Sequence, residues 1–173
     1  MRTGAASATF KGFACKRLAW RAAIGGTAAF FLSFSIIATA VAVEFETSPE
    51  PLVIETGRGP VSFTVELATT SDERSQGLMN RESMAADHGM LFDFGQTRAV
   101  MMWMKNTIMA LDMVFIGPDG KVTGVAADTV PFSEAIISSP GPVRYVLEIN
   151  AGVAAEQGIA AGDTVVHPAV GPE

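Results

Sequence analysis

The segment from Met101 to Asp112 holds the side chains that are best suited to chemistry. It starts as a methionine-rich apolar run around Trp103 and then turns polar, which a strand that only fills a core does not need. An indole face can stack on a planar ligand, and ammonium, amide and hydroxyl groups can form hydrogen bonds to it. The alternative is that Trp103 packs in the core between Met102 and Met104. We predict a ligand-binding site that includes Trp103, Lys105, Asn106, Thr107 and Asp112.

Two arginines lie upstream of this segment. If a helix that begins near residue 70 continues through Asn80, Arg74 and Arg81 lie on one of its faces. Their guanidinium groups could then hold a carboxylate, a phosphate or a sugar acid through bidentate contacts. Alternatively, the arginines pair with acids of the domain itself, such as Asp112 or Glu148, and fix the helix to a sheet. Arg74, Arg81 and Glu148 complete the predicted site.

A methionine cluster offers a second chemistry. Thioethers are soft ligands that suit Cu(I), and the imidazole of His88 could join them, so a copper carrier is an alternative function. The chain has two histidines and one cysteine, which precedes the exported part, so it lacks the ligands of a zinc site and we assign no metal ligand. The clustered residues are Met79, Met84, Met90, Met101, Met102, Met104, Met109 and Met113.

The sequence contains no nucleophile motif. There is no Gly-x-Ser-x-Gly segment, and no cysteine follows Cys15. An acid–base pair made by Asp112 with Lys105 or Glu148 stays open, as in a carboxylate-based hydrolase or lyase. We assign no catalytic residue and no cofactor, and we favour a protein that is not an enzyme.

The elements that would position these residues are mainly strands. Short segments with apolar residues at alternate positions or on both faces indicate β structure. They span 52–56, 60–67, 89–94, 98–104, 112–117, 121–127, 144–150 and 164–167. Pro118 and Gly120 indicate a turn that joins 112–117 and 121–127 in a hairpin. We predict a mainly β fold: a single compact β-sandwich or barrel-like domain with one or two short helices.

The two helices are predicted from their ends. Thr70-Ser71-Asp72-Glu73 is a capping box, in which the threonine hydroxyl accepts from the Glu73 amide while the glutamate reaches back. A second short helix over 151–157 should end at Gly158, because glycine tolerates the left-handed conformation that follows many helices.

The N-terminal segment is predicted to direct export. Its basic residues come before any acidic residue, and residues 22–43 carry no charge and end in small residues. Residues 1–43 are thus a signal peptide, or a membrane anchor through 22–43 if it is not cleaved. We predict a linker over 44–51, the domain over 52–167 and a tail over 168–173 of a periplasmic or other extracytoplasmic protein. The basic residues are Arg2, Lys11, Lys16, Arg17 and Arg21.

The exported part is strongly acidic. All 18 acidic residues follow Val43, with seven of the 12 basic ones, so that part carries a net charge of −11. Such a surface keeps an exported protein soluble and argues against nucleic acid as a partner. The sequence does not predict an oligomeric state.

Several ordered motifs resemble one family. Its pattern is found in Arg74-x-x-Gly77-Leu78-Met79-x-Arg81, in Gly89-Met90-Leu91-Phe92-x-Phe94, in Trp103-Met104-Lys105-Asn106-Thr107 with Leu111-Asp112, in Tyr145-Val146-Leu147-Glu148 and in Gly158-Ile159-x-x-Gly162-Asp163. Residues 52–167 thereby resemble the domain of unknown function 192 family, although Ala110 stands where that family usually has proline. The resemblance implies a compact, mostly β domain of sandwich type, and the activity of the family is not established.

These observations favour a non-catalytic binding module. We expect the eight predicted site residues to surround one pocket for a small polar or anionic ligand, such as a glycan fragment of the cell envelope. A tryptophan beside amide and hydroxyl groups is typical of sugar-binding sandwich domains, which is an analogy based on fold and composition.

Overall fold

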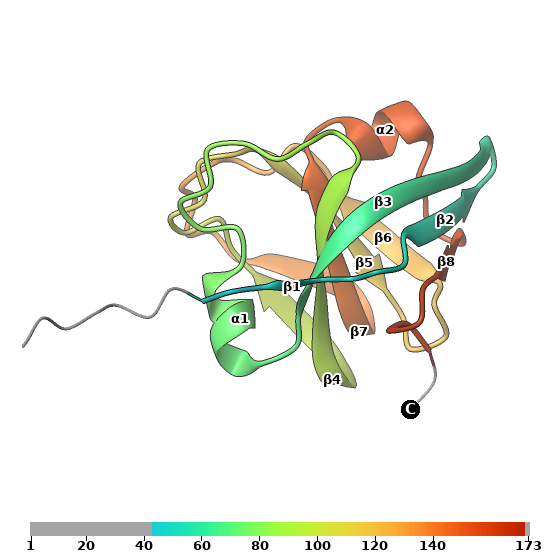
Figure 1. The fold of residues 1–173 in the computed structure, drawn as a ribbon, viewed down its shortest axis with the longest axis horizontal. Helices are drawn as coiled ribbons and strands as arrows, with labels where there is room; N and C mark the ends of the chain where they lie inside the picture. Colours follow the sequence, from blue (N-terminus) through green and yellow to red (C-terminus); the bar gives the residue numbers. More distant parts are fainter. Residues whose placement is uncertain (1–42, 172–173) are drawn as a thin grey trace, which may run out of the picture. The chain divides into compact units, whose positions relative to one another are not determined.

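The computed structural model describes residues 43–171, and an eight-stranded sheet dominates them (Figure 1). The strands are β1 (Glu46–Thr47), β2 (Leu52–Thr56), β3 (Gly59–Ala68), β4 (His88–Met102), β5 (Leu111–Ile116), β6 (Val122–Ala126), β7 (Ile137–Asn150) and β8 (Thr164–Val166). The helices are α1 (Ser71–Gln76) and α2 (Val153–Gln157). The predicted signal or anchor segment lies outside the described residues, except for Val43. No helix among the described residues is long and apolar enough to cross a membrane.

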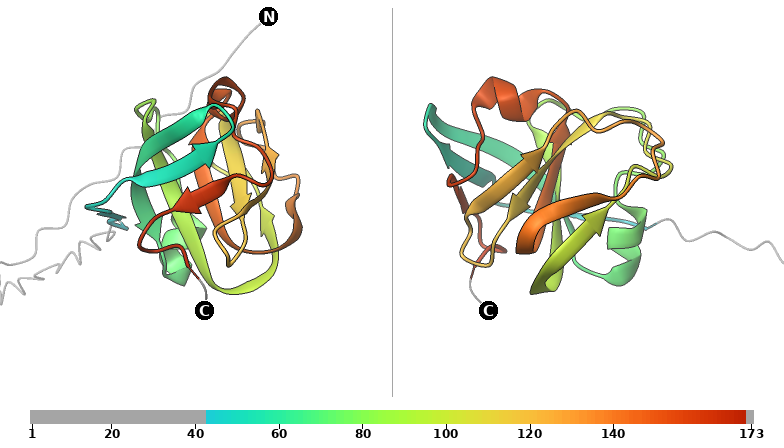
Figure 2. Two further views of the ribbon diagram at one scale, coloured as in Figure 1. Left: turned by 90° about the vertical axis from the view of Figure 1, so that its right-hand side faces the viewer. Right: turned by 180° about the vertical axis from the view of Figure 1, so that it is seen from behind.

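The sheet curls into a half-barrel (Figures 1 and 2). Its strand order is β6-β5-β7-β4-β3-β2-β8, with β1 beside β3, and only the β3–β4 pair is parallel. The two edge strands of the sheet, β6 and β8, approach each other. The Val165 amide donates to the Gly120 carbonyl at 2.8 Å, and the Val122 amide donates to the Asp163 carbonyl at 2.9 Å. The prediction of a mainly β, barrel-like domain with two short helices is confirmed.

Strand β3 shows how the sequence pattern selects this fold. Phe63 and Val65 point into the curl of the sheet, where they pack against the strands on the opposite side. Val61 and Leu67 extend the same apolar row, while Ser62 is exposed on the other face. The predicted alternation is therefore confirmed, and it fixes which face of β3 is buried.

The domain has two apolar clusters, one on each face of the central strands. The first fills the curl and includes Leu147 and Ile149 of β7. The second covers the opposite face and includes Val146 of β7 with Leu78 from the segment that follows α1. Successive residues of β7 therefore enter different clusters. Glu148 lies on the face of Val146, which is buried as well.

Strand β4 differs from the prediction of two separate strands over 89–94 and 98–104. It is one strand, because β7 is long enough to pair with both halves. The register shifts between Asp93 and Arg98, where Gly95 adopts a positive φ of 72°. The polar segment that separated the two predicted strands is an irregularity within one strand.

Helix α1 begins as predicted and ends early. The Glu73 amide donates to the Thr70 hydroxyl at 3.2 Å, and the Thr70 amide donates to the Glu73 carboxylate at 2.8 Å. The capping box is thus confirmed. The helix stops at Gln76 because Gly77 has a φ of 45°, which ends the helical path. The idea that one helix face carries both predicted site arginines is therefore wrong.

Other predicted connections are close to those observed. The hairpin of β5 and β6 is confirmed, and the Gly117 amide donates to the Lys121 carbonyl at 2.8 Å. Helix α2 ends at Gly158 as predicted but starts two residues later than expected, at Val153. Part of the predicted linker joins the sheet, since β1 pairs with β3 and the Ser48 amide donates to the Val65 carbonyl at 2.8 Å.

The cap of α1 gives a first testable expectation. Thr70→Ala removes the hydroxyl that accepts from Glu73, and it should lower the free energy of unfolding by about 1 kcal/mol. Thr70→Ser keeps that hydroxyl and serves as the matched control, with little or no loss. Urea denaturation of the three proteins measures the difference. Equal losses in both variants would show that the cap does not stabilise the helix.

Candidate ligand-binding pocket

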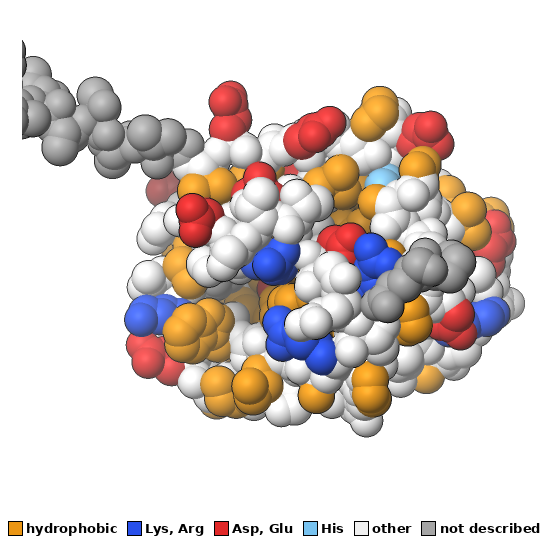
Figure 3. Space-filling model, turned by 90° about the horizontal axis from the view of Figure 1, so that it is seen from below, with side chains coloured by type: hydrophobic (Ala, Val, Ile, Leu, Met, Phe, Trp, Pro, Cys, Tyr) orange, Lys and Arg blue, Asp and Glu red, His pale blue; other side chains and the backbone are white. Residues whose placement is uncertain are grey.

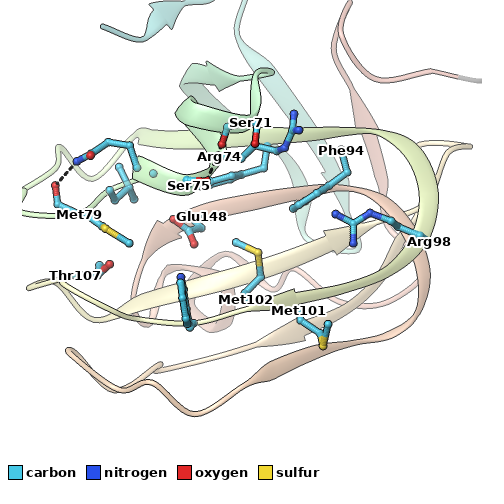
Figure 4. Close-up of a pocket in the computed structure, with 15 residues that line it drawn as sticks. Ser71, Arg74, Ser75, Met79, Phe94, Arg98, Met101, Met102, Thr107 and Glu148 are labelled. Atoms are coloured by element: carbon cyan, nitrogen blue, oxygen red, sulfur yellow. Dashed lines mark hydrogen bonds between the residues drawn. The ribbon is translucent and has the colours of Figure 1, made fainter. Parts of the chain in front are cut away.

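A pocket of about 340 Å³ opens between α1 and the far half of β4. One wall is α1 with the segment that follows it to Met79, and the other is β4 from Phe92 onward with Trp103, the residue after the strand. Figure 3 shows a hollow on this side of the molecule, with basic and hydrophobic side chains around it. Thr107 and Glu148 complete the lining (Figure 4).

Glu148 lies in the interior of this pocket. Strand β7 places it between Met90 of β4 and Met113 of β5, its register partners on either side. Its side chain points into the pocket (Figure 4), and the residue is only 5% exposed. Burial raises the pKa of its carboxyl group from 4.5 to about 8. The group is therefore largely protonated at neutral pH and can both donate and accept a hydrogen bond.

The carboxyl group of Glu148 has no hydrogen-bond or ion-pair partner among the described residues. Among the described residues no side-chain oxygen or nitrogen is both sealed from solvent and without a partner, so the Glu148 oxygens reach the pocket surface. Buried carboxyl groups with a shifted pKa are concentrated at functional sites, where a ligand can supply the missing partner. This carboxyl group is the strongest physical reason to regard the pocket as a binding site.

Arg74 reaches the pocket from α1. Its guanidinium group donates to the backbone carbonyls of Thr69 and Asp93, the latter at 2.8 Å, and lies 5.7 Å from the centre of the Phe94 ring. Arg74 forms no ion pair with Asp112 or Glu148, so that alternative is wrong.

Arg98 is a pocket residue that the sequence reasoning missed. Its guanidinium group lies 5.0 Å from the centre of the Phe94 ring and donates to the Ala99 carbonyl at 3.3 Å. The only sequence signal was a basic residue close to the Trp103 motif in a strongly acidic domain. Arg98 lies near Arg74 because β4 packs against α1. The spacing of apolar residues in the sequence does not show which elements pack together.

Trp103 lies at the edge of the pocket and is 46% exposed. It is not a core residue, although its neighbour Met104 is buried. The Lys105 ammonium group lies 5.3 Å from the centre of the indole ring, beyond the pocket lining. Thr107 is buried and lines the pocket, and its hydroxyl donates to the Lys105 carbonyl at 3.3 Å.

Arg81 lies outside the pocket lining. It forms an ion pair with Glu66 of β3, and its guanidinium group lies 5.5 Å from the centre of the Phe45 ring. The hydrogen bond to Glu66 raises the pKa of the arginine. Arg81 thus fixes the segment after α1 to the sheet, with a partner that the sequence reasoning did not name.

Asn106 and Asp112 have structural roles beside the pocket. The Asn106 carbonyl accepts from the Asn80 amide at 2.9 Å, which joins two of the loops around the pocket. The buried Asp112 carboxylate accepts from the Ala154 amide of α2 and from the Asp128 amide, both at 2.9 Å. Of the predicted site residues, the pocket brings together Arg74, Trp103, Thr107 and Glu148, and it does not include Arg81, Lys105, Asn106 or Asp112.

The clustered methionines are divided between the pocket and the core. Met79, Met101 and Met102 line the pocket, whereas Met90 and Met113 are buried in the second cluster. The described residues contain no group of three or more His, Cys, Asp or Glu side chains that could hold a metal ion. The copper carrier therefore stays a prediction without a defined ligand set.

A pair of carboxyl groups does not meet in the pocket. Glu148 is the one acidic side chain among the described residues of the lining, while Asp112 caps α2. The acid–base pairs that the sequence left open, Asp112 with Lys105 or with Glu148, are not assembled there.

Comparison with known proteins agrees with these motifs. The profile of the DUF192 family, described as "Uncharacterized ACR", matches residues 52–167. The chain belongs to this family. It is 50% identical to a Sinorhizobium meliloti protein of known structure, provisionally named a transcription regulator, with a TM-score of 0.69 over 73% of this chain and 97% of that one. It is 36% identical to a Novosphingobium aromaticivorans protein of unknown function, with a TM-score of 0.68 over 73% of this chain and 94% of that one. No curated protein matches the chain.

The raised pKa of Glu148 makes the stability of this DUF192 protein depend on pH. In the unfolded chain the carboxyl ionises near pH 4.5, and in the folded chain near pH 8. Glu148 therefore lowers the free energy of unfolding progressively as the pH rises from 4.5 to 8. Glu148→Gln stays neutral, so it should be more stable than wild type at pH 8, by up to about 5 kcal/mol, and similar to it at pH 4.

Urea denaturation between pH 4 and 9 measures this difference. Glu134→Gln changes an exposed carboxyl group and is the matched control, which should follow wild type throughout. A constant difference between wild type and Glu148→Gln across this range would mean that the buried group titrates normally.

The structural role of Asp112 is separately testable. Asp112→Ala leaves the buried Ala154 amide and the partly buried Asp128 amide without their acceptor, so it should lower the free energy of unfolding by about 2–4 kcal/mol. Exposed Glu134→Ala should change it by less than about 0.5 kcal/mol. Thermal unfolding of both variants measures these changes. If Asp112→Ala is as stable as wild type, the proposed structural role is wrong and Asp112 is again a candidate for ligand binding.

Proposed function

We propose that this protein is an exported, non-catalytic module that binds a small polar or anionic molecule in the pocket between α1 and β4. The observation that carries the proposal is Glu148, a buried and partnerless carboxyl group that points into an open cavity. A ligand in the cavity can supply the hydrogen-bond partner that this carboxyl group lacks. Export is inferred from the basic and then uncharged N-terminal sequence.

The size and lining of the pocket support a small organic ligand. A volume of about 340 Å³ falls within the range of small-molecule sites. Trp103 and Phe94 offer aromatic surface at the rim, and Thr107 offers a hydroxyl group deeper in. One sugar ring of a cell-envelope glycan is a ligand of this kind, since its apolar face can stack on an aromatic ring while its hydroxyl groups form hydrogen bonds.

Regulation by direct DNA binding is less well supported. One relative is provisionally named a transcription regulator, but residues 44–173 of this chain carry a net charge of −11. Proteins that bind DNA neutralise phosphates with a basic surface. The charge therefore favours a small ligand over nucleic acid.

A second candidate is acid–base catalysis by Glu148 alone. Its pKa of about 8 would let it exchange a proton with a substrate near neutral pH. This candidate lacks a second catalytic group, because no other carboxyl group lines the described pocket. We therefore propose catalysis by Glu148 only as the second candidate, after ligand binding without catalysis.

Native mass spectrometry of the protein purified from its own exported compartment tests the binding proposal. Wild type should carry a small molecule that Glu148→Leu and Trp103→Ala lose while remaining folded. Added back to the unliganded protein, this molecule should bind Trp103→Ala about 10–30-fold more weakly than wild type.

Lys121→Ala is the control, since Lys121 is exposed, bonds to Thr164 and lies outside the pocket lining. It should keep the ligand. An empty wild-type protein, or a ligand kept by Glu148→Leu, would contradict the proposal. Conversion of the added molecule by wild type but not by Glu148→Gln would favour catalysis instead.

A further inference from the structure

Arg74 and Arg98 line the same pocket, and neither forms an ion pair with an acid among the described residues. Elsewhere in the described chain, Arg81 pairs with Glu66 and Arg144 pairs with Asp93. The Arg58 guanidinium group likewise donates only to backbone carbonyls of the described chain, but it lies away from the pocket. What distinguishes Arg74 and Arg98 is that both line one pocket.

The two guanidinium groups converge on one ring. They lie 5.7 and 5.0 Å from the centre of Phe94, so their separation cannot exceed the sum of these distances. Figure 4 shows Phe94 between the two arginine side chains, with Glu148 farther along the lining. An arginine has five N–H donors, and the hydrogen bonds of each to backbone carbonyls use only its Nη1 group. Donors therefore remain on both side chains.

We propose that the pocket selects an organic anion, with a carboxylate or phosphate group held at the end of the pocket lined by Arg74, Arg98 and Phe94, and an uncharged hydrogen-bonding group at Glu148. This inference deepens the proposed function and rests on it. Carboxylates and phosphates share the geometry that guanidinium groups recognise through paired N–H donors. The aromatic surface of Phe94 and Trp103 would lie along the body of the ligand.

The charges around the pocket oppose a cationic ligand. Arg74 and Arg98 are lining residues, and Lys105 lies beside the rim residue Trp103. An ammonium group that entered to reach Glu148 would pass three positive side chains, with only one carboxyl group to attract it. An anion is attracted by the same three charges.

Four probes that share a phenol ring test this charge selectivity. They are 4-hydroxyphenylacetate, 4-hydroxybenzylphosphonate, the uncharged 4-hydroxyphenethyl alcohol, and the ammonium compound tyramine. Binding is measured at pH 7 in the full chain by tryptophan fluorescence, with Trp20→Phe in all proteins so that Trp103 is the only indole. The two anions should bind about tenfold more tightly than the alcohol, and tyramine should bind most weakly. The tighter of the two anions identifies the anionic group as carboxylate or phosphate.

Substitutions in the pocket test which side chains cause the preference for anions. Arg98→Gln should weaken anion binding about tenfold without changing the affinity for the alcohol, while Arg98→Lys keeps part of the effect. Lys121→Gln removes the same charge outside the pocket and should change nothing. Glu148→Leu should weaken both the anions and the alcohol, because both place a hydroxyl group at this residue.

The outcomes separate this inference from the proposed function. If the alcohol binds as well as the anions and Arg98→Gln changes neither, the anion inference is overturned while the pocket function stands. Tightest binding by tyramine, or no binding by any probe at millimolar concentration, also overturns it. If the probes bind wild type and Glu148→Leu equally, they occupy another site, and the proposed pocket function fails as well.

Discussion

The alternation of side chains along β7 is the constraint on which the pocket depends. This strand lies between β5 and β4 in the sheet, and both of its faces are covered by apolar clusters. With Leu147 and Ile149 inside the curl, Glu148 must enter the other buried face. A shift of one residue would place the carboxyl group inside the curl, so the register is strongly fixed. The fold therefore maintains a buried acid that weakens it, which is typical of residues retained for function.

The surroundings of that acid are set by local signals at the ends of short elements. The capping box starts α1 beside the end of β3, and Gly77 ends it after less than two turns. The chain then passes Leu78, which packs in the second cluster, and reaches Arg81, which is held by Glu66. On the opposite side, Asp112 ties α2 to the loop after β6. The contacts of α1, Leu78 and Arg81 thus fix one wall of the pocket, while the Asp112 contacts lie outside the lining. None of these contacts occupies the Glu148 carboxyl group.

The sequence alone was enough to predict the features that depend on residues adjacent in the chain. The capping box, the β5–β6 hairpin and the alternation in β3 each follow from a few adjacent side chains, and all are confirmed. The sequence did not predict contacts between residues that are far apart along the chain. The ion pair of Arg81 with Glu66, the role of Asp112 as a cap for α2 and the meeting of Arg98 with Arg74 over one ring all arise from tertiary packing. Four of the eight predicted site residues therefore line the pocket and four lie outside it, and their role in binding stays a prediction.

The way in which the two ends of the sheet meet has a kinetic consequence. The last strand, β8, pairs with the early strand β2, and the segment beside it bonds to the β5–β6 turn. Contacts between residues so far apart in sequence form late, because a long loop must close before they stabilise anything. The sheet thus cannot be completed until nearly the whole polypeptide is free to fold. Under the proposed export, the part of the chain that has already crossed the membrane could not close its sheet before the C-terminal strand followed it.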